Sequence, residues 1–284
     1  MKYQFIAKEA QVFSVRRLCR VLGVKKSSYY DWKRAGGKVV PLEEFRLRQR
    51  LKELFFASRE SAGSRTLARL LRAEGFRIGR YRVRRLMKSM GLVVKPKRRF
   101  RVTTDSNHGL PVAQNVLDRQ FSPCAINRVW ASDITYVWTV EGWLYLAVVI
   151  DLYSRRVVGW AMSNRADKAL VIRALMMAIA MRQPPPGLIH HSDRGSQYAS
   201  RMYQQLLNAH AMIPSMSRKG NCWDNAPVER FFGSLKREWI GDRLYQTRDQ
   251  AIADIRDYIV GYYNSRRLHS TLGYVTPISF EKCA

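Results

Sequence analysis

The second half of the chain alternates short apolar runs with amphipathic segments. Three runs rich in β-branched and aromatic residues lie at 129–139, 143–151 and 156–163, separated by short polar segments suited to hairpins. Further along, the periodicity predicts a helix over 167–183, a strand over 187–193, a helix over 200–212, a strand over 213–217 and a helix over 227–240. This order, β-β-β-α-β-α-β-α, predicts a mixed five-stranded sheet with helices.

The first third reads as two helix-turn-helix-like units, at 1–38 and 39–94. In the first, a short helix over 15–22 is followed by a turn at Gly23 and a second helix over 25–34. In the second, a connecting helix over 45–60 precedes a helix over 65–75, for which Ser64 is the expected N-cap, and another over 80–92. The rest divides into a basic linker at 95–126, a core at 127–245 and a helical tail at 246–284.

Charge separates the chain into two unequal parts. The formal net charge is +28. Residues 1–101 contain 29 Lys and Arg against 7 Asp and Glu, a net charge of +22, and the remaining residues carry only +6. Such an excess on helical units favours nucleic acid as the partner. A ribosomal protein or a merely solvated basic face is the alternative that charge alone leaves open.

Composition narrows the class of protein further. Hydrophobic residues make up 46% of the chain, enough for a packed core, but no apolar run is long enough to cross a bilayer. The first residues lack the apolar stretch of a signal peptide. The four cysteines have no paired spacing, which indicates free thiols in a reducing compartment rather than a zinc site. We therefore expect a soluble cytoplasmic protein with no membrane partner.

Three carboxylates lie on separate predicted elements. Asp133 lies within the first β run, Asp193 ends the fourth, and Glu229 lies on the last helix, separated from Asp193 by 35 residues. A pair of divalent metals bound about 4 Å apart needs several hard oxygen ligands and serves phosphodiester chemistry. The three acids therefore predict a two-ion site for Mg²⁺ or Mn²⁺. Asp151 is the rival carboxylate, but its place before a turn favours a structural role.

Five strings carry a resemblance to a known family: VWASDITYV, LYLAVVIDLYSRRVVGW, LIHHSDRGSQYAS, SRKGNCWDNAPVERFFGSLKRE and YYNSRRLHSTLGYVTP. They span roughly 127–280 and resemble the OrfB part of transposases of insertion sequence family three, whose cores are similar to retroviral integrases. The resemblance implies an α/β, ribonuclease-H-like catalytic core preceded by an all-α helix-turn-helix DNA-binding region. It also implies an OrfA partner or an OrfA–OrfB fusion.

The main hypothesis is a bacterial DDE transposase located at the nucleoid. It would bind element ends as a homo-oligomer on double-stranded DNA, hydrolyse a phosphodiester and transfer the strand without a covalent intermediate. Asp133 and Asp193 would hold one ion, and Asp133 and Glu229 the other.

Basic side chains around these elements are the expected DNA contacts. On the helix over 80–92, an apolar face of Val83, Leu86 and Met87 leaves the basic residues pointing outward. Phosphate contacts of this kind position DNA without reading its sequence. The predicted DNA-binding residues are Arg80, Arg82, Arg84, Arg85, Lys88, Lys97, Arg98, Arg99, Arg194, Arg218, Lys219 and Lys236.

Several residues near the acids have open roles. Asp224 and Asn225 lie in a loop before the last helix, where Asn225 is a candidate N-cap and Pro227 suits the first turn. His191 could orient the site, touch DNA or hold the strand end structurally.

Two other functions compete with the transposase hypothesis. A non-cleaving OrfB product could bind DNA and regulate transposition. A tyrosine recombinase could use Tyr262 or Tyr263 with Arg266, Arg267 and His269, and it would form a phosphotyrosyl adduct without metal.

Overall fold

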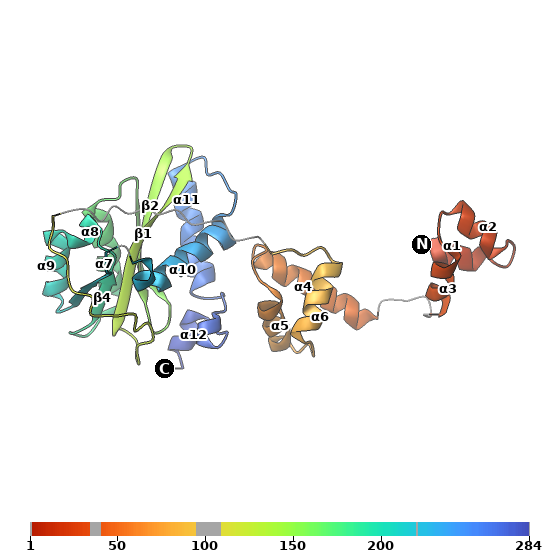
Figure 1. Ribbon diagram of the computed structural model, residues 1–284, viewed down its shortest axis with the longest axis horizontal. Coiled ribbons are helices and arrows are strands. Elements are labelled where there is room, and N and C mark those ends of the chain that lie inside the picture. The colour runs from red at the N-terminus through yellow and green to blue at the C-terminus, as the bar shows by residue number, and fades with distance from the viewer. Residues whose placement is uncertain (1, 35–40, 95–108, 220, 284) are drawn as a thin grey trace.

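The computed structural model describes residues 2–34, 41–94, 109–219 and 221–283 (Figure 1). Its first unit contains three short helices, α1 (Lys2–Glu9), α2 (Val15–Val21) and α3 (Lys26–Arg34). The turn after α2 uses Gly23 at φ +62°, a left-handed conformation that glycine adopts without strain. The periodicity predicted α2 and α3 but not α1, which buries Ile6 against Leu18 and Tyr29.

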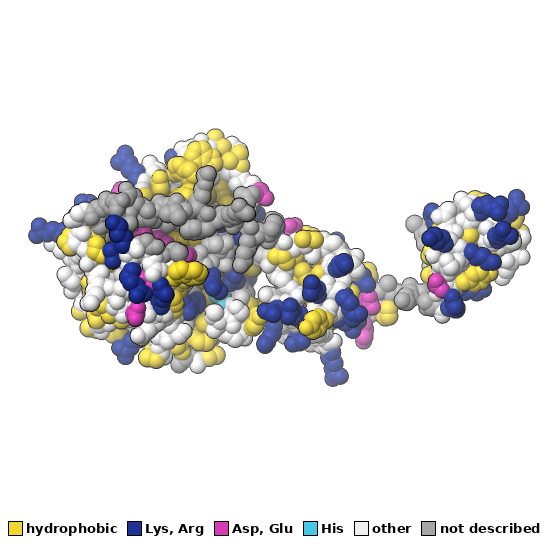
Figure 2. All heavy atoms as spheres, viewed as in Figure 1, with side chains coloured by type: hydrophobic (Ala, Val, Ile, Leu, Met, Phe, Trp, Pro, Cys, Tyr) yellow, Lys and Arg dark blue, Asp and Glu magenta, His cyan; other side chains and the backbone are white. Residues whose placement is uncertain are grey.

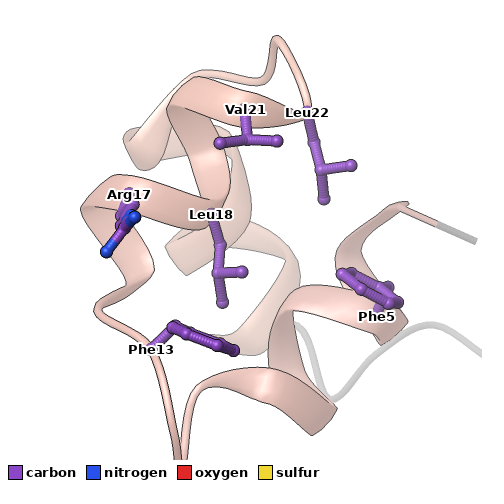
Figure 3. A pocket seen from close by; sticks show the side chains of 6 residues that line it. All are labelled: Phe5, Phe13, Arg17, Leu18, Val21 and Leu22. Carbon is purple, nitrogen blue, oxygen red and sulfur yellow. The ribbon is translucent and has the colours of Figure 1, made fainter.

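The surface of this first unit carries an apolar depression between α1 and α2. Phe5, Phe13, Leu18 and Leu22 line it, with Arg17 at its side (Figure 3). Phe5 and Phe13 are themselves exposed.

The second unit packs α4 (Leu42–Ala57), α5 (Ser64–Ala73) and α6 (Arg80–Ser89) around one small core. Leu51, Phe55, Leu67, Leu71 and Val83 are central to it. The prediction that Ser64 caps α5 was wrong: Ser64 is the first helical residue, and Gly63 precedes it without a side-chain cap. The described residues therefore confirm an all-α N-terminal region.

The core contains a mixed five-stranded sheet in the order β3-β2-β1-β4-β5. Its strands are β1 (Val129–Thr139), β2 (Gly142–Asp151), β3 (Val157–Ser163), β4 (Ile189–Ser192) and β5 (Ile213–Met216). The first three strands pair antiparallel through tight connections, while β4 and β5 run parallel to β1. Parallel pairs need crossovers, which the intervening helices provide. The predicted element order and ribonuclease-H-like fold are confirmed.

Helices cover both faces of the sheet (Figure 1). One face packs Trp130, Ala147 and Val149 against α7 (Lys168–Arg182), α8 (Ser196–Ala199) and α9 (Arg201–Ala209). Here α7 approaches β3 so closely that a Cβ at Gly159 would collide with the carbonyl oxygen of Ala174. Glycine at this strand position therefore permits the helix–sheet contact.

The other face packs against the C-terminal helices. The hydrophobic cluster of β1 and β2 includes residues of α10 (Ala226–Ser234), η2 (Leu235–Ile240), α11 (Arg248–Arg256) and η3 (Asp257–Tyr263). The predicted single helix over 227–240 changes to π-helical hydrogen bonding at Leu235. Because Ala251, Ile255 and Tyr258 lie in this cluster, the predicted boundary at residue 245 does not coincide with a break in the core.

The last residues are also tied to the sheet. After the short turn η4 (Ser270–Leu272), α12 (Pro277–Glu281) carries Glu281, whose carboxylate accepts hydrogen bonds from Arg156, Arg182 and Ser154. Leu117, from the segment predicted as linker, is buried in the core, and the backbone N–H groups of Val116 and Leu117 donate to Ser215 Oγ. The described part of the predicted linker, 109–126, thus packs on the core.

Candidate active site

Asp133 and Asp193 lie at the same level of neighbouring strands. Val129 pairs with Ile189 and Ala131 with His191 in the parallel register of β1 and β4. Two residues further on, this register brings Asp193, the first residue beyond β4, level with Asp133. Adjacent strands are about 4.8 Å apart, so the two carboxylates start from closely spaced backbones. Since side chains alternate along a strand, Asp133 projects to the face of Ala131, where α10 packs.

The local backbone holds both carboxylates. Asp133 Oδ1 accepts a hydrogen bond from the N–H of Ile134 at 2.7 Å. Asp193 Oδ1 accepts one from the N–H of Gly195 at 2.9 Å. A Cβ at Gly195 would come within 3.0 Å of this oxygen and 2.8 Å of Gln197 Oε1, so any larger residue would have to displace these two side-chain ends.

Charge repulsion links the two aspartates. Burial raises the pKa of the Asp133 carboxyl well above its usual range, and the neighbouring charges of Asp193 and Glu229 raise it further. The hydrogen bond from Ile134 and the ammonium group of Lys236 act in the opposite direction. A carboxyl whose pKa is raised by neighbouring negative charges lies in a favourable environment for a cation.

Glu229 reaches this cluster from helix α10. The helix buries Val228, Phe231 and Phe232 against the sheet, and Glu229 lies half-buried beside that face. Burial raises the pKa of the Glu229 carboxyl. Asn225 does not cap the helix with its side chain; its amide donates to the carbonyl oxygen of Ser132 at 3.1 Å. This bond fixes the start of α10 beside Asp133, and Pro227 lies in the first turn as predicted.

The three acids are neighbours without yet forming a closed ligand cage. Among the described residues, no three His, Cys, Asp or Glu side chains are placed to bind one ion together. The donor set nevertheless consists of hard carboxylate oxygens, the kind that Mg²⁺ prefers. The predicted ligands therefore fit the predicted metal by donor type and charge.

A buried carboxylate to which the sequence assigned no role, that of Asp224, organises the loop before α10. Asp224 is fully buried and accepts hydrogen bonds from Arg218, Arg119 and Asn115 at 2.8 to 3.0 Å. Hydrogen bonds from Arg218 hold the pKa of Asp224 far below its usual range against the effect of burial. Arg218, predicted to bind DNA, thus uses its guanidinium within the chain. The other two partners of Asp224, Arg119 and Asn115, come from the predicted linker, more than 100 residues upstream.

The two histidines before Asp193 are structural. The His190 ring lies 2.9 Å from Ser132 Oγ and 3.1 Å from the Tyr203 hydroxyl. The His191 ring lies 2.9 Å from Ser215 Oγ and 3.2 Å from Ser217 Oγ. Burial lowers the pKa of His190 to about 3 and that of His191 to about 4. Both rings are neutral at pH 7, and of the three roles considered for His191 the structural one agrees with this burial.

The other core residues that were predicted to bind DNA differ in the contacts that they make within the chain. Arg194 Nε donates to the carbonyl oxygen of Ser217 at 2.6 Å. Lys219 is exposed. Lys236 Nζ lies 4.7 Å from the centre of the Tyr136 ring, and burial lowers its pKa while the charge of Asp133 raises it. Lys236 therefore lies on the acid side of α10 and η2, as its spacing from Glu229 predicted.

Helix α6 presents its basic side chains outward. Val83, Leu86 and Met87 form its buried face, while Arg82, Arg84, Arg85 and Lys88 are exposed and Arg80 is half-buried. Lys and Arg side chains gather on the surface of the second unit (Figure 2). The predicted contacts Lys97, Arg98 and Arg99 lie outside the described residues.

Burial contradicts the tyrosine recombinase hypothesis. Tyr263 lies in the hydrophobic core against Phe231, and burial raises its pKa to about 12. The Arg267 guanidinium donates to both oxygens of the buried Glu238 at 2.6 and 2.7 Å. His269 is buried, and its ring meets that of Tyr263 edge to face. Tyr263, Arg267 and His269 pack the core, and the other candidate nucleophile, the half-buried Tyr262, stacks on the ring of Trp239, so neither tyrosine is presented to DNA.

Domain families agree with this architecture. The integrase core domain family matches residues 125–222 and 210–277, and an HTH-like domain matches 43–100. A simian T-cell lymphotropic virus intasome, solved with PP2A regulatory subunit B56 gamma, is 19% identical with a TM-score of 0.49 over 81% of this chain and 74% of that chain. The HTLV-2 integrase catalytic core domain in complex with magnesium (trimeric form) is 19% identical, with a TM-score of 0.44. The match covers 56% of this chain and 98% of that chain.

Relatives with higher identity extend over nearly the whole chain. A 31 kDa protein of insertion element IS600 from Shigella sonnei, described as uncharacterized, is 46% identical over 93% of this chain and 97% of its own. Transposase InsF for insertion sequence IS3A from Escherichia coli (strain K12) is 42% identical over 99% of this chain and 98% of its own. No helix in the described ranges has the length and hydropathy to span a membrane. The chain belongs to the IS3 family of insertion-sequence transposases, which are DDE-type enzymes built on an integrase core.

Proposed function

We propose that Asp133, Asp193 and Glu229 are the catalytic carboxylates and metal ligands of this transposase. The observation that carries the proposal is the parallel register that places Asp193 level with Asp133, together with the Asn225–Ser132 bond that holds the helix of Glu229 beside them. Asp133 lies between the other two acids and interacts electrostatically with both.

In this proposal each ion is bound by two of the three acids. Asp133 and Asp193 bind one divalent ion, and Asp133 and Glu229 bind a second. Mg²⁺ or Mn²⁺ bound there activates the attacking oxygen and stabilises the leaving oxygen of a phosphodiester. Glu229 shares the second ion with Asp133 from the edge of α10, beside the buried face of that helix.

The DNA partner is the end of the element that encodes the chain. The exposed arginines of α6 bind its backbone, and Lys219, Arg194 and Lys236 lie near the acids, where the scissile phosphate must come. Arg218 contributes indirectly, since it fixes the loop before α10 through Asp224. Lys97, Arg98 and Arg99, which lie outside the described residues, are proposed as DNA contacts from their charge and their place in the sequence after α6.

The assembly follows from the reaction. Joining two element ends requires at least two active sites, so the enzyme works as a homo-oligomer on DNA, with an OrfA partner or as an OrfA–OrfB fusion. The predicted units at 1–38 and 39–94 provide DNA binding, and the protein acts at the bacterial nucleoid in the cytoplasm.

Cleavage of end DNA tests the proposal. Wild type, Glu229→Gln and the control Glu43→Gln, which changes an exposed glutamate on α4, are compared with Mg²⁺ and with EDTA. We expect cleavage by wild type and the control only with Mg²⁺, and at least a hundredfold loss in Glu229→Gln. Cleavage that survives in Glu229→Gln would exclude this glutamate as a ligand. Binding by all three without cleavage by any would favour the regulatory product, or an enzyme that needs its OrfA segment.

A further inference from the structure

Three aromatic rings form a continuous row on the β1–β2 hairpin. The rings of Tyr136 and Trp143 meet edge to face with centroids 4.8 Å apart, and those of Trp143 and Trp138 with centroids 4.7 Å apart. Trp138 remains 50% exposed and Trp143 42% exposed. Hydrophobic side chains gather at the hairpin end of the core (Figure 2). We call Tyr136, Trp143 and Trp138 the aromatic row.

The aromatic row lies on the opposite face of β1 from Asp133, along the strand edge that β4 leaves open. Tyr136 follows Asp133 by three residues on β1, and Lys236 Nζ lies 4.7 Å from its ring centre. Strand β4 pairs with β1 only as far as Ala131, and an isolated bridge from Thr139 to Tyr245 closes the same edge further up. Lys236 links the aromatic row to the acids, because its ammonium group lies over the Tyr136 ring and its charge also lowers the pKa of Asp133.

Helix α11 holds the hairpin in place. Arg248 Nε donates to the carbonyl oxygen of Trp143 at 3.1 Å, and its guanidinium also donates to the carbonyl oxygen of Glu141. The backbone N–H of Arg248 donates to the Glu141 carboxylate at 2.8 Å. Exposed tryptophans on a hairpin anchored in this way are presented in a fixed orientation, which favours binding.

We propose that the aromatic row is a stacking platform for an unpaired nucleobase of the DNA end, a few nucleotides from the phosphate that the acids process, since Trp138 lies five residues, about 17 Å, along β1 from Asp133. This inference rests on the proposed function. Aromatic side chains stack on bases of any sequence, and a neighbouring ammonium group neutralises the adjoining phosphate. A base must leave the duplex to reach such a platform, which strand ends permit most readily.

The size of the row favours a base over a second protein. Stable protein interfaces bury about 800 Å² per partner. Two tryptophans that are each about half exposed offer at most a few hundred Å² together. One or two stacked bases match that area, and Lys236 gives the row a basic end.

Binding in EDTA tests the platform without requiring cleavage. Two duplexes with the same element-end sequence, one fully paired and one with unpaired terminal bases, are titrated by fluorescence anisotropy. Wild type is compared with Trp138→Leu, which keeps an apolar side chain without a ring face, and with Trp138→Phe, which keeps a ring. Met181→Ala is the control for an exposed apolar residue at the far end of α7.

We expect wild type, Trp138→Phe and Met181→Ala to bind the unpaired end more tightly than the paired one. Trp138→Leu should lose about 5- to 150-fold of that preference, the range of one stacked base. An unchanged preference in Trp138→Leu, an equal loss in Trp138→Phe, or a change in self-association instead of DNA affinity would overturn the platform. Glu229→Gln should keep the preference, so failure of the metal-site proposal is seen separately in the cleavage assay.

Iodouracil in the unpaired bases gives a second measurement. Irradiation should attach it mainly to Trp138 or Trp143, because the photochemistry favours aromatic rings in contact with the base. Adducts confined to other elements would overturn the assignment even if a Trp138 variant folded poorly.

Discussion

Removing the Arg59 side chain should loosen the second helical unit from the catalytic core. Arg59, just beyond α4, lies with its guanidinium 3.4 Å from the centre of the Trp239 ring. It also donates to both carboxylate oxygens of Asp254, at 3.1 and 3.4 Å. Arg59 and Glu60 adopt left-handed φ values of 51° and 63°, which are costly for non-glycine residues. The contact must offset that strain.

The expected loss follows from the partners. The stacking of a partly desolvated guanidinium on tryptophan contributes about 1 kcal/mol. The ion pair contributes about 1 kcal/mol more, because the side chains of Arg59 and Asp254 are 25% and 16% exposed and solvent screens them only in part. Asp254 keeps Arg243, Tyr245 and Trp239 as donors, so no unpaired buried charge is left behind. We expect Arg59→Ala to lower the free energy of unfolding by about 2 kcal/mol.

Chemical denaturation followed by tryptophan fluorescence measures this loss, and Trp239 is one of the seven tryptophans whose emission follows the transition. The matched control is Arg48→Ala, which removes a half-exposed pair with Glu44 within α4 and should cost less than about 0.5 kcal/mol. Arg59→Lys should fall between the two, because lysine keeps the charge but not the planar fork. If Arg59→Ala costs no more than Arg48→Ala, the contact does not hold the unit and the reasoning fails.

Two further predictions concern packing and pH. Gly159→Ala should destabilise the core by about 1–3 kcal/mol in thermal unfolding, because the added Cβ collides with α7. The control Gly233→Ala, whose Cβ meets no atom within 4 Å, should be neutral or stabilising. Equal effects of the two substitutions would contradict the close approach of α7 to β3. Burial, and the charge of Arg267, lower the pKa of His269 to about 3 from an ordinary 6.5, so its neutral form contributes stability that is complete above pH 6.5 and lost as the pH falls toward 3. In denaturation between pH 6.5 and 4, His269→Gln should therefore lose stability less steeply than wild type, by one proton, and parallel curves would contradict this origin.

Much of the candidate site was predictable because its chemistry is local in sequence. Asp133, Asp193 and Glu229 each lie in a short string with clear periodicity, and the strand order that brings them together follows from the alternation of runs. The role of Asp151 was predictable for the same reason. Its carboxylate accepts hydrogen bonds from the N–H groups of Asn127 and Tyr153, and the second of these forms the turn that its position predicted.

The role of Arg218 was not predictable, because a basic residue in a loop gives no sign of its partner. Its partner Asp224 also accepts hydrogen bonds from Arg119 and Asn115, which come from a segment predicted to be a linker. Helix α1 was missed for a related reason: its buried side is essentially Ile6, too little for a periodic signal.

The sequence by itself determined the family, the order of the elements and the acids of the candidate site, since these depend on residue types at fixed spacing. Tertiary structure decided which charges remain for DNA, where the catalytic core ends, and that Tyr136, Trp143 and Trp138 stand in one row. Cross-strand register and ion pairing join residues far apart in the chain, and the free energy of each such contact depends on burial, which periodicity alone does not specify.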